Sequence, residues 1–293
     1  MSQRDAVVER FISKNRNVLL AKADFGRLFR AYLEHSRAWV GDPDGLILIM
    51  MRQALAAAAL YLTCRPTDEN TAWTINFPEP PLNIFVTCDA SAGRVVGRYY
   101  TDHVKAEPET RLIVQAVRRT GEPQLSILAV TGFDILSIFE QYYTQSEQLT
   151  VRFFELEEDR FYMVMALPDI DEAWLHGLTR GEVLALLEEE TTQKIEERPV
   201  RFACACSAER LAVVTGKMFA GRLDELFGDD AQLEAHCPQC GRAYELTRAQ
   251  LEAQTAPGAG QGPETAAGET SAGETGTHKK AQPPGDEPQD GVV

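Results

Sequence analysis

Apolar residues recur at helical spacing in two early segments of the chain, residues 5–13 and 25–36. An apolar stripe with this period is typical of a helix that buries one face. Between them, residues 18–22 form a short apolar run that favours an extended conformation. The pattern therefore predicts a helix, a short strand and a second helix at the start of the chain.

The longest apolar stretch runs from residue 46 to residue 62. Arg52 and Gln53 interrupt it near its middle, and alanine dominates the residues that follow them. A membrane-spanning helix needs about 20 predominantly apolar residues and tolerates few charges near its centre. The stretch therefore predicts a helix buried in the core of a globular protein, and we expect no membrane partner.

The following part of the chain consists of short apolar segments separated by turn-forming residues. Five segments rich in β-branched and aromatic residues predict strands: 72–77, 82–87, 94–100, 111–118 and 124–130. A helix is expected over 133–147, followed by a hairpin of strands 150–156 and 160–167 with its turn at 157–159. Short connections favour antiparallel neighbours. These elements together predict an α+β fold, an antiparallel-sheet core with packed helices.

Beyond residue 168 the pattern becomes helical again, over 173–178 and 181–190, and then polar and charged over 191–198, which indicates a linker. The last residues are mainly Gly, Pro, Ala, Glu and Thr, with almost no large apolar side chain to bury. The predicted organisation is therefore an α+β core (1–168), a helical and charged linker (169–199), a small cysteine-containing domain (200–253) and a disordered acidic tail (254–293).

The charge balance restricts the partners. The chain has 44 acidic and 29 basic residues, a formal net charge of -15. Binding to nucleic acid needs a positive footprint, so nucleic acid is not expected as a principal partner. The amino-terminal residues contain no apolar signal segment. We therefore expect a cytoplasmic protein whose cysteines are reduced.

Four of the six cysteines form two close pairs, Cys204 with Cys206 and Cys237 with Cys240. In an extended chain, residues two apart point to the same side, so the first pair can face one metal ion. The second pair has the form Cys-Pro-x-Cys-Gly, in which proline presets a turn and Gly241 lets the backbone curl behind the sulfurs. Two such pairs can converge on one tetrahedral Zn²⁺ with Zn–S distances of about 2.3 Å. We therefore predict a small C-terminal zinc-binding domain with one Zn²⁺ per chain.

These residues allow more than one function. The four cysteines could form a purely structural zinc site in a protein-binding module. Cys237 and Cys240 could instead be the reactive pair of a thiol-disulfide oxidoreductase, although such enzymes place the pair at a helix N-terminus after a strand. A disulfide across a single residue, as between Cys204 and Cys206, is expected to be strained and easily reduced, which suggests a redox switch.

The remaining candidate ligands are interpreted as bystanders. Cys64 and Cys88 lie in apolar surroundings and are expected to pack as small buried hydrophobic residues. His236 adjoins Cys237, but four thiolates already complete a tetrahedron. The acidic clusters have no nearby candidate nucleophile, so we predict no enzymatic activity.

The cysteine module resembles that of the redox-regulated 33-kDa chaperonins, the heat-shock protein 33 family. In the cysteine module, the resemblance rests on the two motifs and on the thirty residues that separate the two cysteine pairs: Cys204-Ala205-Cys206-Ser207 with Glu209-Arg210, and Cys237-Pro238-Gln239-Cys240-Gly241 with Tyr244. In the core, it rests on Glu140-Gln141-Tyr142-Tyr143 leading to Ser146-Glu147-Gln148. It covers residues 4–251 approximately.

The resemblance implies a chaperone that works without ATP, is silent while four thiolates hold zinc, and binds unfolded proteins as a holdase after oxidation. It also implies an oxidised homodimer. We predict disulfides Cys204–Cys206 and Cys237–Cys240, although four cysteines allow three pairings and sequence alone does not choose between them. The apolar residues expected to bind clients are Val183, Leu184, Leu186 and Leu187.

Overall fold

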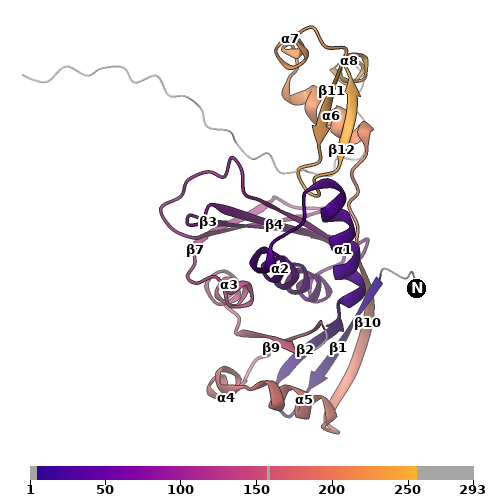
Figure 1. Ribbon diagram of the computed structural model, residues 1–293. Helices are drawn as coiled ribbons and strands as arrows, with labels where there is room; N and C mark the ends of the chain where they lie inside the picture. The colour runs from indigo at the N-terminus through magenta and orange to yellow at the C-terminus, as the bar shows by residue number, and fades with distance from the viewer. Residues whose placement is uncertain (1–4, 157–158, 256–293) are drawn as a thin grey trace, which may run out of the picture. The chain divides into compact units, whose positions relative to one another are not determined.

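The computed structural model describes residues 5–156 and 159–255. Within these ranges the chain forms a ten-stranded sheet, a set of helices and a small two-stranded sheet (Figure 1). The disordered tail predicted over 254–293 lies outside the described residues from 256 onward, as does the predicted turn at 157–158. The α+β fold class is confirmed.

The large sheet is almost entirely antiparallel. Its strands are β1 (Asp5–Ser13), β2 (Val18–Asp24), β3 (Glu69–Phe77), β4 (Leu82–Asp89), β5 (Arg94–Tyr100), β6 (Arg111–Arg118), β7 (Gln124–Ala129), β8 (Val151–Leu156), β9 (Arg160–Ala166) and β10 (Thr192–Phe202). Their order in the sheet is β7-β6-β3-β4-β5-β10-β1-β2-β9-β8. The short pairing of β10 with β5 is parallel, and it joins the two halves of the sheet.

The helices complete the fold, and several of them begin at a side-chain cap. They are α1 (Gly26–Trp39), α2 (Gly45–Thr63), α3 (Ile135–Tyr142) with the π-helical turn η1 (Tyr143–Glu147), α4 (Glu172–Gly177), α5 (Arg180–Glu188), α6 (Ala208–Met218), α7 (Leu223–Phe227) and α8 (Arg248–Thr255). Asp44, Asp134 and Asp171 each accept a backbone N–H at the start of a helix, which satisfies a donor that has no partner within the helix.

Helix α2 is the centre of the core. Strands from both halves of the sheet lie above and below it in Figure 1. From Met50 to Thr63, every residue except Arg52 is buried, which explains why this helix is apolar nearly all round. By length and composition it could span a membrane, but 67% of its apolar window is buried inside the protein. The prediction of a buried core helix is confirmed.

The helix predicted over residues 5–13 is wrong, because this segment is strand β1. Ala6 and Val8 are buried while their neighbours are only partly covered, the alternation of a strand. A bulge between Arg10 and Phe11 shifts the register against β10. Because β10 follows almost two hundred residues later in the chain, local spacing could not show the pairing.

The charged segment 191–198 was predicted as a linker, and this is also wrong, because it forms most of β10. Its charges are paired across the strands: Lys194 donates to Glu9 at 2.6 Å, and Arg10 lies 3.3 Å from Glu196. Cross-strand ion pairs allow a strand with one solvated face to carry many charges. Because β10 is central in the sheet and ends at Phe202, shortly before Cys204, it connects the core to the cysteine module.

A second apolar cluster covers the outer face of β2, β9 and β8. Val18, Phe154 and Val164 from the strands pack with Val183 and Leu186 of α5. Helix α5 begins with a capping box, in which Thr179 and Glu182 each bond to the other's backbone N–H. The helix is therefore anchored on the core sheet.

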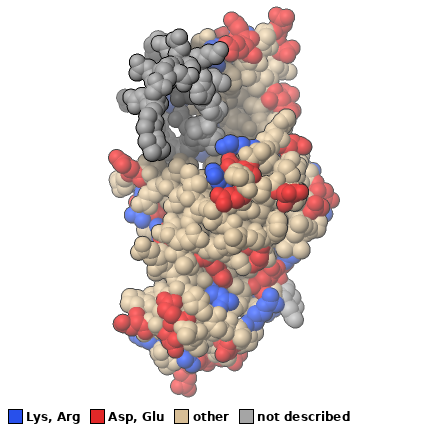
Figure 2. All heavy atoms as spheres, turned by 90° about the vertical axis from the view of Figure 1, so that its left-hand side faces the viewer, with Lys and Arg blue, Asp and Glu red and all other residues tan. Residues whose placement is uncertain are grey.

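Charged side chains are unevenly spread on the face shown in Figure 2. Acidic residues are numerous at its upper and lower ends, and basic and acidic side chains lie together near the middle, above a broad uncharged band. The edge strand β7 carries two of the most exposed large apolar side chains, Leu125 (62% exposed) and Ile127 (60%). An exposed sheet edge with apolar side chains is a place where other chains can dock.

A buried carboxylate connects α2 to the sheet. The Glu69 side chain is 1% exposed and accepts hydrogen bonds from Arg65 (2.8 Å), Arg118 (3.0 Å) and Thr71 (3.2 Å). Burial opposes ionisation of Glu69, but the bonds from Arg65 and Arg118 outweigh it and lower the pKa. The ionised carboxylate therefore stabilises the fold above the pH at which an unfolded glutamate titrates, and this contribution is lost as the pH falls through the lowered pKa.

We expect Glu69→Gln to reduce the free energy of unfolding at neutral pH by about 2–3 kcal/mol, because both arginines lose a charged partner but keep access to water. The difference from the wild-type protein should shrink below about pH 4. Urea unfolding of both proteins, at neutral pH and below about pH 4, measures this difference in the free energy of unfolding. Glu122→Gln, at an exposed position, is the matched control, and an equal effect of both substitutions would contradict the role of the network.

Candidate metal centre

The second cysteine pair lies in a tight turn of the small sheet. Strand β11 (Gln232–His236) ends before Cys237, and β12 (Ala243–Thr247) begins after the turn. The Cys237 N–H donates to the Arg242 carbonyl at 2.9 Å, and the Gly241 N–H donates back to the Cys237 carbonyl at 2.8 Å. Gly241 has φ of +80°, a left-handed conformation that glycine adopts without strain. We call residues 237–241 the cysteine loop.

The first pair lies in extended chain between β10 and α6. Ser207 caps α6 by accepting the Arg210 N–H at 3.3 Å, and the Arg210 side chain donates to the Ala205 carbonyl at 2.9 Å. These two bonds fix the backbone on both sides of Cys206. The extended backbone here allows the sulfurs of Cys204 and Cys206 to face one point, as the sequence predicts.

The structure brings the four predicted cysteines together. The sulfurs of Cys204, Cys206, Cys237 and Cys240 all lie within 4.8 Å of one another. Cys204 Sγ is 3.8 Å from Cys237 Sγ, and Cys206 Sγ is 3.5 Å from Cys240 Sγ. A tetrahedron with Zn–S distances of about 2.3 Å has edges of about 3.8 Å. All four are free thiols, so the donor set and its spacing are consistent with zinc.

The two pairs differ in their exposure to solvent. Cys240 is fully buried and Cys237 is 2% exposed, whereas Cys204 and Cys206 are partly accessible. The Tyr244 hydroxyl lies 3.2 Å from Cys206 Sγ. Tyr244 is the aromatic residue on which part of the sequence resemblance rested.

The thiols alter one another's pKa. Hydrogen bonding with Cys204 lowers the pKa of Cys206 and lowers that of Cys237 to about 7, while the pKa of Cys204 itself is raised. A thiol that donates to a neighbouring sulfur favours the thiolate on that neighbour. Hydrogen bonding with Cys204 also lowers the pKa of Cys240, but the other two cysteines and burial outweigh it and raise that pKa. The thiolate, the form that binds metals and reacts with oxidants, is therefore favoured at Cys206 and Cys237.

The other candidate ligands lie outside the cluster. His236 Nδ1 lies 3.2 Å from the Gly241 carbonyl, and Nε2 lies 2.9 Å from Glu234 Oε1. Both ring nitrogens therefore have partners other than the cysteine sulfurs. Cys88 is part of the main core cluster and Cys64 packs against it. Burial raises the pKa of both thiols, which fits the prediction that they are small apolar core residues.

Three side chains of the core donate hydrogen bonds to the cysteine loop, and the sequence did not indicate them. Each donates to a backbone carbonyl: His35 Nε2 to Cys240 (2.8 Å), the Tyr100 hydroxyl to Pro238 (2.5 Å), and Arg98 Nη1 to Cys237 (3.4 Å). Burial lowers the pKa of His35, so the neutral ring that donates through Nε2 is favoured. Backbone carbonyls carry no sequence signal, and the partners are distant in the chain.

The residues predicted to bind clients are on α5, where only some are accessible. Val183 and Leu186 are buried in the second apolar cluster, whereas Leu184 is 45% exposed and Leu187 is half-buried. Among the described residues, this cluster contains none from the cysteine module. Their release therefore requires α5 to leave the core sheet, and their role in client binding stays a prediction.

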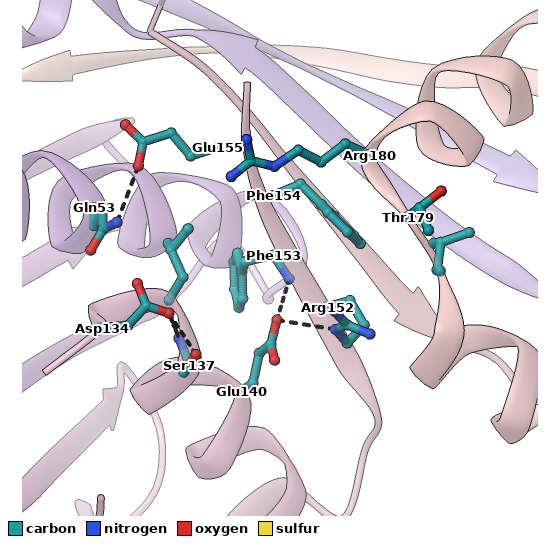
Figure 3. A pocket seen from close by; sticks show the side chains of 12 residues that line it. Gln53, Asp134, Ser137, Glu140, Arg152, Phe153, Phe154, Glu155, Thr179 and Arg180 are labelled. Atoms are coloured by element: carbon teal, nitrogen blue, oxygen red, sulfur yellow. Dashed lines mark hydrogen bonds and ion pairs between the residues drawn. The ribbon is translucent and has the colours of Figure 1, made fainter. Parts of the chain in front are cut away.

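A polar groove of about 370 Å³ lies beside the start of α5 (Figure 3). Thr179 and Arg180 line one side, and Glu140 and Arg152 line another. Arg152 pairs with Glu140 at 3.5 Å and also donates to the Leu175 carbonyl at the end of α4 (3.4 Å). These contacts fasten the α4–α5 segment to the edge strand β8.

Comparison with known families identifies the chain. The model of the Hsp33 protein family matches residues 6–247. The chain belongs to the Hsp33 family. This confirms the family resemblance, which rested on the cysteine spacing and on the residues around Tyr142.

Individual Hsp33 relatives are distant in sequence. The 33 kDa chaperonin of Bacillus licheniformis is 34% identical over 131 residues, covering 45% of this chain and 42% of that protein. The 33 kDa chaperonin of Aliivibrio fischeri is 25% identical over 183 residues, and 59% of it is covered, so the chain spans about half the length of such relatives. That of Azotobacter vinelandii is 25% identical over 249 residues, covering 73% of this chain and 83% of that protein.

The fold agrees with a solved Hsp33 structure. The crystal structure of the 33 kDa chaperonin from Thermotoga maritima, a heat shock protein 33 homologue, superposes with a TM-score of 0.62. The match covers 87% of this chain and 98% of that chain, at 14% sequence identity. At this identity the similarity supports the fold.

We expect the reduced protein to bind one Zn²⁺ per chain, and Cys240→Ser to weaken that binding by more than about a hundredfold, because loss of an outer-shell contact alone costs 10- to 100-fold. Competition with a chromogenic chelator measures the affinity. Cys64→Ser is the matched control and should retain the wild-type affinity. Equal zinc binding by both variants would contradict the four-sulfur site.

Proposed function

We propose that this Hsp33-family chain is an ATP-independent holdase chaperone that binds unfolded proteins after its cysteines have been oxidised. The observation that carries the proposal is the meeting of four free thiols within 4.8 Å in a chain of a chaperonin family. We further propose that it acts in the cytoplasm during oxidative stress, as a homodimer in its oxidised form.

In the reduced form, Cys204, Cys206, Cys237 and Cys240 would hold one Zn²⁺. The bound ion would keep the four thiolates deprotonated and contribute about 10–16 kcal/mol to the folding of the module. The module has few buried side chains of its own, among them Leu211, Phe227, Leu246 and Leu251. A domain of this size usually needs a metal or disulfides to fold, so its stability is expected to follow the state of the cysteines.

Oxidation would remove the ligands in balanced two-electron steps. A thiolate attacks hydrogen peroxide and becomes a sulfenic acid, releasing hydroxide. A second cysteine then attacks that sulfur, expels the oxygen as water and forms a disulfide. Each disulfide thus consumes one peroxide and two thiols. Once paired, the sulfurs no longer provide thiolate ligands.

The pairing Cys204–Cys206 with Cys237–Cys240 is the one we propose. In the folded module every pairing is within reach, since all four sulfurs are neighbours. Once the module has lost its metal and unfolded, the shortest loops close with the smallest entropic cost. That favours a disulfide within each close pair.

A binding function fits the geometry better than thiol-disulfide oxidoreductase activity. A reactive Cys-x-x-Cys pair sits in an electropositive, partly exposed site at a helix N-terminus. Here Cys237 and Cys240 lie in a turn between two strands and are almost fully buried. A substrate disulfide could not reach them in the folded module, and turnover in an insulin-reduction assay would contradict this reasoning.

The remaining alternative is a zinc module that binds proteins without redox switching. We expect protein oxidised with peroxide to lose its zinc and to suppress the aggregation of a chemically denatured client, while reduced protein suppresses it weakly. The variant Cys204→Ser/Cys206→Ser should lose this response, and Cys64→Ser should keep it. Light scattering of the client and peptide mapping of the disulfides provide the measurements. Equal suppression by reduced and oxidised wild-type protein would favour the structural module.

A further inference from the structure

The side-chain hydrogen bonds described between the core and the cysteine loop all end on backbone carbonyls of the loop. His35, Arg98 and Tyr100 provide three side-chain donors, and the loop provides three carbonyl oxygens. Arg98 and Tyr100 are two apart on β5 and therefore project to the same side of the strand. His35 comes from α1. We call these three residues the donor triad.

Carbonyl recognition is independent of sequence. Every residue of a polypeptide carries a backbone carbonyl, and an unfolded chain presents these groups unpaired. Donors placed to grip main-chain carbonyls can therefore bind a stretch of any unfolded protein. This is the selectivity that a holdase needs.

Aromatic side chains surround the donor triad. The Arg98 guanidinium lies 4.2 Å from the centre of the Tyr100 ring, and the His35 and Phe202 rings are 5.6 Å apart. Trp39, at the end of α1, is 40% exposed and lies under the Arg242 guanidinium. Such aromatic surroundings can accept apolar side chains of a bound segment beside its main chain.

Arg98 also has unused donor capacity. Its Nε is buried and has no hydrogen-bond partner among the described residues. A buried N–H without an acceptor is costly, so its presence needs an explanation. An acceptor supplied by a bound main chain, in a slightly different position from the Cys237 carbonyl, would satisfy it.

The cysteine loop packs closely against the core at Gly241. A Cβ atom on Gly241 would lie 2.7 Å from Val40 Cγ2, so the backbone of the loop touches the end of α1 directly. The positions of its carbonyls depend on the turn that also directs the sulfurs of Cys237 and Cys240. A disulfide between these cysteines, or loss of their metal, would change that turn and withdraw the carbonyls.

We propose that the donor triad is a binding site for the main chain of unfolded polypeptides, which the cysteine loop fills while the thiols are reduced. The loop thus acts as an internal substitute for a client. This inference rests on the proposed holdase function and specifies where an oxidised molecule contacts its client.

The test uses the oxidised full-length chain, in which the proposal requires the loop to have left the site. The triple variant His35→Phe/Arg98→Met/Tyr100→Phe removes the donors but keeps most of the side-chain volume. The probe is fluorescently labelled, reduced and carboxymethylated α-lactalbumin, which is permanently unfolded, and anisotropy measures its binding. Loss of three hydrogen bonds should weaken binding at least about tenfold.

Tyr99→Phe is the matched control, because it removes a hydroxyl from the same strand at a residue for which no contact with the loop is found. It should bind the probe within about twofold of the wild-type protein. If the triple variant binds as tightly as the wild type, the donor triad is not the client site. If oxidised wild-type protein does not bind the probe at all, the holdase function itself fails, which is a separate result.

The single variant Tyr100→Phe keeps the test decisive should the triple variant fold poorly. Removing one hydroxyl donor should weaken probe binding about two- to tenfold in the oxidised form. In the reduced form it should raise hydrogen exchange in the cysteine loop, because the loop loses one of its three anchors. Unchanged binding together with unchanged exchange would overturn the proposal.

Discussion

The meeting of four cysteine sulfurs at one point is the constraint on which the rest of this structure depends. The module around them is a two-stranded sheet and three short helices, with only a few buried apolar side chains. Apolar burial of this extent does not hold so small a domain together. A metal ion held by the four sulfurs, or disulfides between them, would supply the missing stabilisation, and these two kinds of linkage demand different backbone geometries. The proposed redox response is therefore assigned to this module.

The core, by contrast, is stable for reasons that do not involve the four clustered cysteines. Helix α2 is buried between the two halves of a ten-stranded sheet, and Glu69 is satisfied by a network of arginine and hydroxyl donors. Strand β10 belongs to this sheet and ends directly before Cys204. Any rearrangement of the module is thus transmitted to a fixed point of the core. A rearrangement of the module also affects a second point of the core, where His35, Arg98 and Tyr100 donate hydrogen bonds to the cysteine loop.

The sequence predicted those features that depend on local pattern. The hairpins β3 to β7, helix α2 and the turn at Cys237 each have a signal within a short window, because their partners are neighbours in the chain. Strands β1 and β10 were missed because they pair across almost the whole chain, and ion pairs such as Lys194 with Glu9 gave β10 the composition of a linker. The four clustered cysteines were predicted from their spacing. The core residues that donate hydrogen bonds to the cysteine loop were not predicted, because every residue has a backbone carbonyl and the sequence does not show which carbonyl is bound.

We propose that the cysteine sulfurs, through what they bind, keep the module folded. Hydrogen exchange of the β11 and β12 amides, followed by mass spectrometry while zinc is counted in the same samples, measures this dependence. We expect protected amides in reduced, zinc-loaded protein, loss of protection in step with loss of zinc on addition of peroxide, and recovery after reduction with zinc present. Amides that stay protected after the zinc has gone would show that the module folds without the ion.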